Sequence, residues 1–229
     1  MKRNLISVVI PAKDRIEFTS DAILSVTKQK IPNNMSLEII VIDNRSNPPL
    51  SKKLSKIFPN VLFINNSRKD HPGGSRNVGL LKTKGEYIAF LDNDDQWKDN
   101  FLLESVKNIK QSNVSATLVL TDQYFYGKFP FFRKIKLTIL NLIRYIFLIF
   151  FYYFHKKTLP QSAFYLCQIS HMMFKRVSIG NNHFNENEVA AEDWEFVADV
   201  TENGKIKIIP KRLVKFRYEI RSNTNSPKV

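Results

Sequence analysis

The first half of the chain alternates between two patterns of hydrophobic positions. Short apolar runs rich in β-branched residues predict buried strands over residues 5–12, 37–44, 60–66 and 86–92. The segments between and after them space their apolar residues as helices do, over 17–30, 48–58, 75–84 and 99–112. A further run at 115–125 predicts a strand that closes this half. This alternation predicts an α/β fold, with a mostly parallel sheet and helices on both faces.

The second half has a different pattern. Residues 129–157 are dense in aromatic side chains and bounded by basic clusters, and residues 204–220 are rich in strand-forming residues, before a frayed end at 221–229. We therefore divide the chain into a first half, an aromatic helical segment and a second half, at residues 1–126, 127–160 and 161–229.

Polar residues follow the predicted strands. They form the stretches "PAKDR" (11–15), "DNRS" (43–46), "NNSRKDHPGG" (65–74) and "DNDD" (92–95). In a parallel sheet the carboxyl ends of the strands lie at one edge, where ligands bind. We expect these stretches to meet there.

Composition indicates the kind of binding partner and the cellular compartment to expect. The chain has 35 Lys and Arg against 21 Asp and Glu, a formal net charge of +14, which favours an anionic partner. No zinc-finger spacing, ribonucleoprotein box or basic zipper is present, which argues against nucleic acid. The single cysteine, Cys167, excludes an intramolecular disulfide, and the N-terminus does not resemble a signal peptide. We expect a cytoplasmic protein, or one at the inner face of the cell membrane.

Asp92, Asp94 and Asp95 crowd into four positions directly after an apolar strand. Such carboxylates raise one another's pKa unless a positive charge lies between them. Asp92-Asn93-Asp94 has the form of an Asp-X-Asp pair for Mg²⁺ or Mn²⁺, which bind one or two carboxylates together with substrate phosphates. The alternative is a solvated turn in which Asp95 or Asp99 caps the next helix.

Two other stretches offer chemistry. In "HPGGSRNVG" (71–79), Gly73 and Gly74 permit close backbone approach to a ligand and Arg76 suits a phosphate, although a plain tight turn fits equally well. In "AEDWEF" (191–196), Asp193 beside an aromatic residue suits a general base, although an acidic helix start explains it too.

Cysteine and histidine residues suggest no metal site. Cys167 and His171 are four residues apart, with His183 further along, but they lack a fourth ligand at the usual zinc spacing. We therefore expect core or loop roles for these residues.

Five stretches follow one another along the chain in the order "SVVIPAKDR", "IIVIDNRS", "GGSRNVGL", "YIAFLDNDD" and "AEDWEF". Together they resemble the family 2 glycosyltransferases, closely over residues 4–112 and loosely over 165–220. The resemblance implies the GT-A fold, with a C-terminal acceptor region, and an inverting, metal-dependent transfer of a sugar from a nucleoside diphosphate to an acceptor hydroxyl. It implies Mn²⁺ or Mg²⁺ as cofactor, a UDP-sugar as the favoured donor and a glycan or lipid-linked acceptor in bacterial surface polysaccharide synthesis.

The resemblance also assigns residues. Asp94 and Asp92 would bind the metal, and Asp193 would be the catalytic base. The residues that it places at the nucleotide sugar are Pro11, Ala12, Asp14, Asp43, Asn44, Gly74, Arg76, Asp92 and Asn93.

The chain departs from the family pattern in two places. Asn44 stands where members often have an aspartate that accepts a hydrogen bond from uracil, and its amide oxygen could still accept one. Near the C-terminus Arg217 matches, but Glu219 stands near the place of a histidine, so the part played by residues 217–222 is open.

The aromatic segment is too polar in its first half for a clear membrane span. Lys134, Thr138, Asn141 and Arg144 form a polar stripe at helical spacing. We favour an amphipathic helix on the membrane surface, with a buried helix or homodimer seam as the alternative.

Three rival functions are weaker than glycosyl transfer. A catalytically silent scaffold that binds a membrane or partner need not keep Asp92, Asp94 and Asp193, and a nucleic-acid-binding domain should show a recognition motif. A nucleotidyltransferase should have a Gly-rich loop after the first strand, where "PAKDR" has no glycine.

Overall fold

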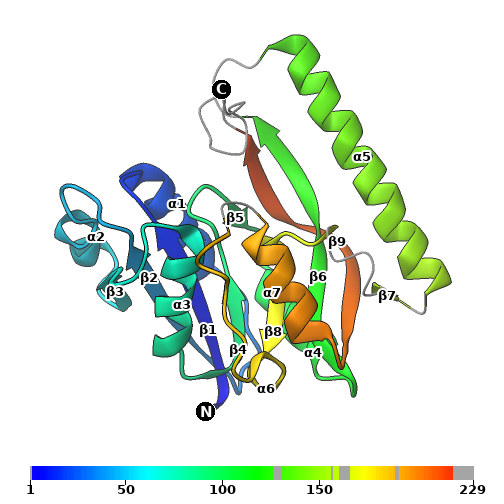
Figure 1. The fold of residues 1–229 in the computed structure, drawn as a ribbon, viewed down its shortest axis with the longest axis horizontal. Helices are drawn as coiled ribbons and strands as arrows, with labels where there is room; N and C mark the ends of the chain where they lie inside the picture. Colours follow the sequence, from blue (N-terminus) through cyan, green and yellow to red (C-terminus); the bar gives the residue numbers. More distant parts are fainter. Residues whose placement is uncertain (1, 126–129, 156, 160–165, 189–190, 219–229) are drawn as a thin grey trace.

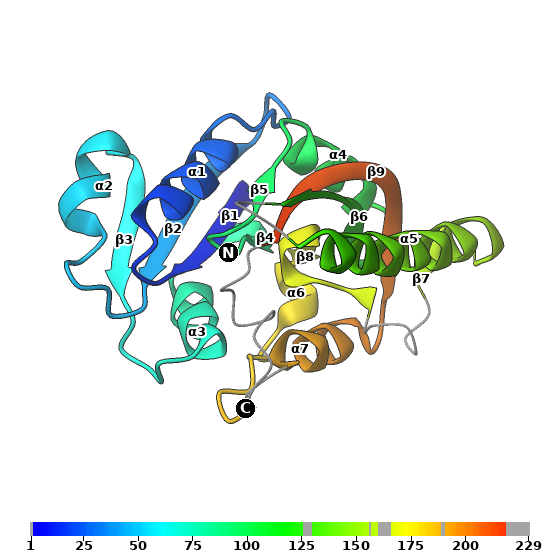
Figure 2. The same cartoon turned by 90° about the horizontal axis from the view of Figure 1, so that it is seen from above.

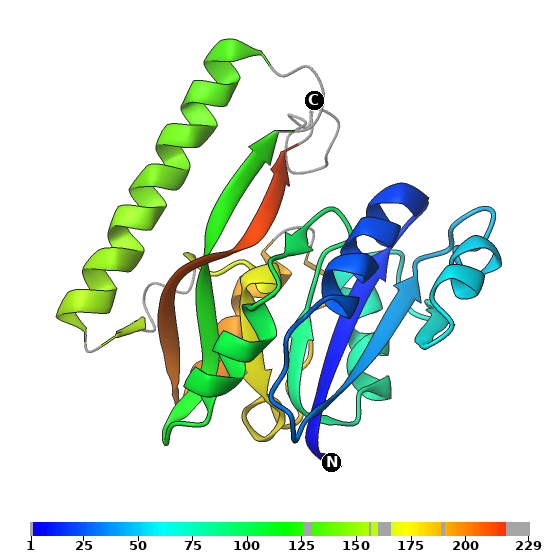
Figure 3. The ribbon, with the colours of Figure 1, turned by 180° about the vertical axis from the view of Figure 1, so that it is seen from behind.

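One mixed sheet runs through the protein. The computed structural model describes residues 2–125, 130–155, 157–159, 166–188 and 191–218 (Figure 1). In this part of the chain the strand order is β3-β2-β1-β4-β8-β6-β9-β5, and β7 pairs with β9 to complete a nine-stranded sheet. The two halves of the chain therefore share one sheet, which Figure 3 shows from behind.

The predicted first half is confirmed element by element. Its strands are β1 (Lys2–Ala12), β2 (Ser36–Asp43), β3 (Val61–Asn65) and β4 (Gly85–Phe90), and its helices are α1 (Ile16–Thr27), α2 (Ser51–Ile57), α3 (Pro72–Lys82) and α4 (Phe101–Ile109). β1 pairs in parallel with β2 and β4, and β2 pairs in parallel with β3. The near-continuous apolar runs arise because helices cover both faces of these strands.

Two hydrophobic cores lie on the two faces of the sheet. Ile6, Val8 and Ile10 of β1 pack in the core that holds α1, α2 and α4. Val9 packs in the other core, with α3, α6 (Arg176–Ile179) and α7 (Glu192–Thr201). Figure 2 shows α1 and α4 on one side and α3, α6 and α7 on the other. The period of two along β1 follows from the alternation of side chains on a strand.

The second half contains a strand, β8 (Met172–Lys175), that the sequence did not predict. β6 (Val114–Phe125) does not adjoin β4, because β8 lies between them and pairs antiparallel with both. β6 pairs in parallel with β9 (Lys205–Tyr218), which carries the two-residue strands β5 (Gln96–Trp97) and β7 (Thr158–Leu159). β8 is short, and Met172, Met173 and Phe174 are all buried, so its sequence shows no alternation.

The aromatic segment forms a single helix, α5 (Phe131–Phe154), beside β6, β7 and β9 (Figure 1). Leu148 is its one buried residue, and Tyr145 and Tyr152 pack against the core at its side. The Arg144 side chain donates to the Leu166 carbonyl and, at 2.6 Å, to Gln168 Oε1, which attaches the helix to the domain. The rest of α5 is largely exposed, so the buried-helix alternative is wrong within this chain.

The strand order places the binding edge. From β1 the chain moves outward through β2 and β3, then returns to place β4 on the other side of β1. The loops after β1 and β4 therefore diverge at a topological switch point, where open α/β sheets bind their ligands.

Candidate active site

The loop after β4 carries the acidic cluster. Asp92 N–H donates to Ser170 Oγ at 3.0 Å, and the Asp92 carbonyl accepts from Asp95 N–H at 3.0 Å. Asp95 itself is buried, and its Oδ1 accepts from the backbone N–H of Arg217 at 3.2 Å. The helix-cap alternative is wrong, since the N-cap of α4 is Asn100. Asp92 and Asp94 are left as the partly exposed pair, while Asp95 ties the loop to β9.

Asp94 lies in a site with excess negative charge. Burial, then the neighbouring Asp92, raises its pKa to about 6. Arg15 partly offsets this charge, with its Nη1 at 3.4 Å from Asp94 Oδ2. A raised carboxylate pKa means that the ionised form lacks compensation, and a bound cation would supply it.

The donor set fits a cation that shares its coordination with a ligand. Among the described residues no three His, Cys, Asp or Glu side chains gather into a metal cage. Asp92 and Asp94 offer two hard oxygen ligands, the number that Mg²⁺ or Mn²⁺ takes when phosphates complete its shell. This chemistry supports the predicted site of Asp94 and Asp92 and leaves room for a diphosphate.

Arg76 joins the acidic loop to α7. From the buried face of α3, its Nη2 lies 2.7 Å from Asp92 Oδ1 and its Nη1 lies 2.7 Å from Glu192 Oε1. Burial opposes the charge, but the Asp92 and Glu192 carboxylates raise the pKa of Arg76 overall. The Phe184 ring lies 5.5 Å from the guanidinium carbon. Arg76 thus contacts two carboxylates of the protein, and its predicted contact with a nucleotide stays a prediction.

Asp193 lies in the first turn of α7, next to Glu192 of this ion pair. Burial raises its pKa to about 6; Arg76 opposes that shift, and Glu192 and Asp92 add to it. The next residue, Trp194, donates from Nε1 to the Cys167 carbonyl at 3.1 Å, which fixes the start of the helix. The acidic helix start is also present, since Glu192, Asp193 and Glu195 fill the first turn. A carboxylate with a pKa near neutrality suits a general base.

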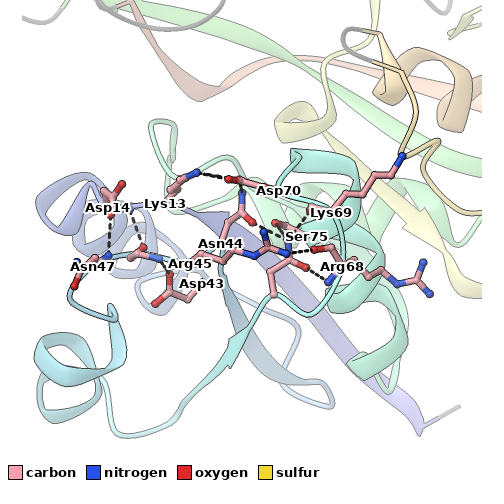
Figure 4. A network of polar contacts seen from close by, with 12 residues as sticks. Lys13, Asp14, Asp43, Asn44, Arg45, Asn47, Arg68, Lys69, Asp70 and Ser75 are labelled. Atoms are coloured by element: carbon pink, nitrogen blue, oxygen red, sulfur yellow. Dashed lines mark hydrogen bonds and ion pairs between the residues drawn. The ribbon is translucent and has the colours of Figure 1, made fainter.

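The predicted nucleoside residues gather at the ends of β1 and β2. Pro11 and Ala12 end β1 and are buried, and Asp14 follows in the left-handed region at φ 57°. Asp14 accepts from Asn47 N–H at 3.1 Å, and its own N–H donates to Ser46 Oγ at 2.8 Å (Figure 4). The structure thus brings these residues together at the predicted edge.

Two other predicted residues, Asp43 and Asn93, form hydrogen bonds within the protein. Asp43 accepts from the N–H groups of Ser46 and Leu50, at 2.9 and 2.8 Å, so it holds the loop after β2. The Asn93 amide donates to Thr19 Oγ1 of α1 at 3.1 Å.

Gly74 serves packing within the protein. A Cβ there would lie 2.7 Å from the Lys69 carbonyl oxygen, so glycine lets α3 approach its own preceding loop. His71 closes the start of that helix, because its Nδ1 accepts from Gly73 N–H at 3.1 Å. The close backbone contact at Gly74 is thus with Lys69, and the approach of a ligand to these glycines stays a prediction.

Cys167 and His171 have core roles, as expected. Both are buried; burial raises the pKa of Cys167 to about 12 and holds the pKa of His171 well below its usual value. Arg217 is also buried, pairs with Asp21 at 3.1 Å and lies 3.9 Å over the Phe18 ring. Residues 219–222, whose part the sequence left open, lie outside the described residues.

Sequence reasoning missed several residues of the site. Glu192 was seen only as a neighbour of Asp193, and Arg15 and Ser170 were not singled out, although they hold Asp94 and Asp92. Arg15 lies within "PAKDR", so its place after β1 was a usable signal. For Ser170 the sequence contains no such signal, because it is 78 positions from Asp92 along the chain.

Two hollows are lined by residues of α3, α6, α7 and the loop before α7. One of about 510 Å³ lies between α3 and α6 and includes Arg68 and Arg176 in its lining. Another, of about 610 Å³, is lined by Asn181–Asn187 and the outer side of α7. Neither includes Asp92, Asp94 or Asp193, so we place the chemistry by the charged groups and not by the size of the hollows.

Comparison with known proteins identifies the family. The profile described as "Glycosyl transferase family 2" matches residues 7–179, more than half of the chain. The chain belongs to glycosyl transferase family 2. A family relative from Escherichia coli, the "UDP-Glc:alpha-D-GlcNAc-diphosphoundecaprenol beta-1,3-glucosyltransferase WfgD", is 28% identical over 136 residues, or 57% of this chain and 53% of that one. An "Uncharacterized glycosyltransferase" of Rickettsia bellii is 34% identical over 110 residues, 47% of this chain and 15% of that protein.

Solved structures agree on the fold. TarS of S. aureus in complex with UDP-GlcNAc matches 98% of this chain and 61% of its own, with a TM-score of 0.74 at 18% identity. The mannosyltransferase PcManGT from Pyrobaculum calidifontis, in complex with GDP-Man and Mn²⁺, matches 95% of this chain and 57% of its own, with a TM-score of 0.67 at 14% identity. The predicted GT-A fold of the family is confirmed. The chain spans about half of the WfgD relative's length and a smaller part of the Rickettsia protein.

Proposed function

We propose that this protein is an inverting glycosyltransferase that moves a sugar from a nucleoside diphosphate to an acceptor hydroxyl in bacterial surface polysaccharide synthesis. The observation that carries the proposal is the double contact of Arg76. It joins Asp92 of the acidic loop to Glu192, the residue next to Asp193, through two bonds of 2.7 Å. Groups suited to a diphosphate and to a general base are thereby held at one edge of the sheet. The WfgD relative supports a UDP-sugar and a lipid-linked acceptor.

The residues suggest a single displacement. Asp193 takes the proton of the acceptor hydroxyl, whose oxygen attacks the anomeric carbon from the face opposite the diphosphate. The new C–O bond forms as the bond to the diphosphate breaks, so the anomeric configuration inverts. Arg76 holds Asp92 in place on one side and Glu192 on the other, which fixes the distance between the two reacting partners.

Asp92 and Asp94 would hold Mn²⁺ or Mg²⁺. When bound, the ion neutralises charge on the departing diphosphate. Arg15, beside Asp94, adds a fixed positive charge at the same edge.

A donor panel tests the proposal. We expect one nucleoside diphosphate sugar to raise the melting temperature only with Mn²⁺ or Mg²⁺, and to be hydrolysed slowly when acceptor is absent. Asp94→Asn should abolish this shift, since it removes one of two carboxylate ligands, whereas Asp99→Asn, at an exposed position before α4, should keep it. A folded protein that binds no donor with either metal would favour the rival reading, a silent scaffold.

We also propose that α5 rests on the cytoplasmic membrane surface. Its outward side exposes apolar residues along its whole length, including Ile139, Ile143, Phe147 and Phe150, each more than 40% exposed. Arg133, Lys134 and Lys136 add positive charge at one end, which suits acidic headgroups. Although the helix is long and apolar enough to cross a bilayer, Arg144 at its middle is bonded into the domain. One side of the helix, with Tyr145, Leu148 and Tyr152, is thus attached to the protein, which favours a helix lying in the interface.

Vesicle flotation tests the membrane contact. We expect the protein to float with vesicles that contain acidic phospholipid, and the variant with Ile139, Ile143, Phe147 and Phe150 changed to serine to remain at the bottom. A matched control changes four exposed apolar residues elsewhere to serine, namely Ile57, Leu62, Leu81 and Val177, and should still float. If instead the α5 change converts a soluble dimer into a monomer without altering flotation, the helix is a subunit seam.

A further inference from the structure

The position expected to read the base is already engaged. Asn44 is buried; its Oδ1 accepts from Asn66 Nδ2 at 2.7 Å, and its Nδ2 donates to Asp70 Oδ1 at 2.7 Å. Both carboxylate oxygens of Asp43, one position earlier, accept hydrogen bonds from backbone N–H groups of the loop after β2. Neither side chain is therefore free to turn outward without breaking bonds inside the protein. The group that these contacts present at the surface is Asp70.

Asp70 is held by groups from three loops. Lys13, after β1, donates to both of its oxygens at 2.9 and 2.7 Å, and Asn44, after β2, donates to Oδ1 (Figure 4). Asp70 itself belongs to the loop between β3 and α3, which Asn66 anchors by donating to the Lys69 carbonyl at 2.9 Å. A carboxylate has about four lone-pair positions, so these three bonds leave one on Oδ2.

The charge and exposure of Asp70 leave the remaining lone pair on Oδ2 available to a ligand. The hydrogen bond from Lys13 lowers the pKa of Asp70, so the group is ionised at neutral pH. The side chains of Lys13 and Asp70 are 47% and 43% exposed. The ammonium of Lys13 has three protons, and its two bonds to Asp70 leave one for another acceptor. The pair thus presents one acceptor and one donor side by side to solvent.

The sheet places this pair on the nucleoside side of the site. Asp92 and Asp94 follow β4, whereas Lys13, Asn44 and Asp70 follow β1, β2 and β3, in a sheet of order β3-β2-β1-β4. Adjacent strands are about 4.8 Å apart, so the end of β2 lies roughly 10 Å from the end of β4. On the opposite side of β4, β8 and α7 bring Asp193. A diphosphate at Asp92 and Asp94, with its sugar toward Asp193, therefore directs its nucleoside toward Asp70.

We propose that Asp70, held by Lys13 and Asn44, selects the nucleobase by accepting a ring N–H while Lys13 donates to the adjacent carbonyl. This inference rests on the proposed function and names its donor class. Uracil offers that pair as N3–H and O4. Cytosine offers the reverse, a ring lone pair and an amino group, which repel a carboxylate and an ammonium. The site therefore takes a uridine diphosphate sugar and rejects the cytidine analogue.

Binding of UDP and CDP in the presence of Mn²⁺, measured by calorimetry on the full chain, tests the inference. We expect the wild type to bind UDP at least tenfold more tightly than CDP. Asp70→Asn presents an amide that can donate, so it should weaken UDP binding roughly tenfold and strengthen CDP binding. Lys13→Met removes the donor to O4 and two of the bonds that hold Asp70, so it should weaken UDP binding. Asp99→Asn, an exposed aspartate before α4, should leave the ratio unchanged.

The outcomes separate this inference from the proposed function. If UDP binds with Mn²⁺ and the binding is lost in Asp94→Asn, but Asp70→Asn keeps the wild-type ratio of UDP to CDP affinity, the assignment of Asp70 is wrong and the glycosyltransferase proposal stands. If the folded wild type binds neither nucleotide, both are overturned. Melting curves of each variant show that the chain is folded, which Asp70 at the surface should permit.

Discussion

Replacing Asp193 by asparagine is expected to lower kcat about 10²–10⁴-fold while leaving donor binding nearly unchanged. Asparagine has the size of aspartate but cannot take the proton of the acceptor hydroxyl. The measurement is a steady-state assay with saturating donor and acceptor, together with calorimetric binding of the donor. Glu195→Gln, which removes an exposed carboxylate from the same turn of α7, should retain wild-type kcat.

The pH dependence of the wild type gives a second readout for Asp193. Because its pKa is raised to about 6, the residue is protonated and inactive below that pH, so kcat/KM should rise between about pH 5 and 7. The facing charges are Arg76 on α3, Asp92 after β4 and Glu192 on α7 itself. The residual rate of Asp193→Asn should lack this rise. A variant with near-normal kcat, or one that keeps the wild-type pH profile, would assign the base to another group.

Replacing Arg76 by methionine is expected to destabilise the fold by about 3 kcal/mol and to abolish donor binding. The change leaves the buried Glu192 carboxylate without its cation and frees Asp92 from the position that Arg76 sets. Asp92 is partly solvated, with a side chain 34% exposed, so the loss of Glu192's partner accounts for most of the cost. Urea unfolding and donor calorimetry measure the two effects.

A double variant isolates the ion pair from simple loss of packing. Arg76→Met with Glu192→Gln should be more stable than Arg76→Met alone, because the stranded charge is removed. Arg68→Met is the matched control: Arg68 precedes α3 and pairs with Glu186 at 2.6 Å, but its side chain is 44% exposed, so its loss should cost about 1 kcal/mol or less. Strictly additive costs for Arg76 and Glu192 would remove the argument that one arginine holds both carboxylates.

The fold of the first half could be predicted because its signals are local. Each of these strands and helices can be recognised from a run of apolar residues, or from their helical spacing, within about ten residues. The helices bury one face against β1, β2 and β4. β8 could not be found in this way. Its four residues are covered on both faces, and its pairing with β4 joins positions more than 80 apart, such as Ala89 with Met173.

The place of the loops could be predicted from the sequence, but the contacts of their side chains could not. Asp92 and Asp94 lie in the loop after β4, as the strand pattern predicted, and Arg76 joins Asp92 to Glu192 beside Asp193. The contact of Arg76 with Glu192 spans 116 positions, and that of Asn44 with Asp70 depends on how the loop before α3 folds back. Neither partner follows from spacing along the chain. Asn44 is an example. Its amide could form a hydrogen bond with a nucleobase, but in the fold it is hydrogen-bonded to Asn66 and Asp70.

The position of β8 bears on how such proteins can be recombined. Met173 is a ladder neighbour of Ala89 on one side and of Thr117 on the other, so a fragment cut after residue 112 would expose an unpaired edge at β4. A chimaera that joins the front of one enzyme to the back of another must reproduce both registers.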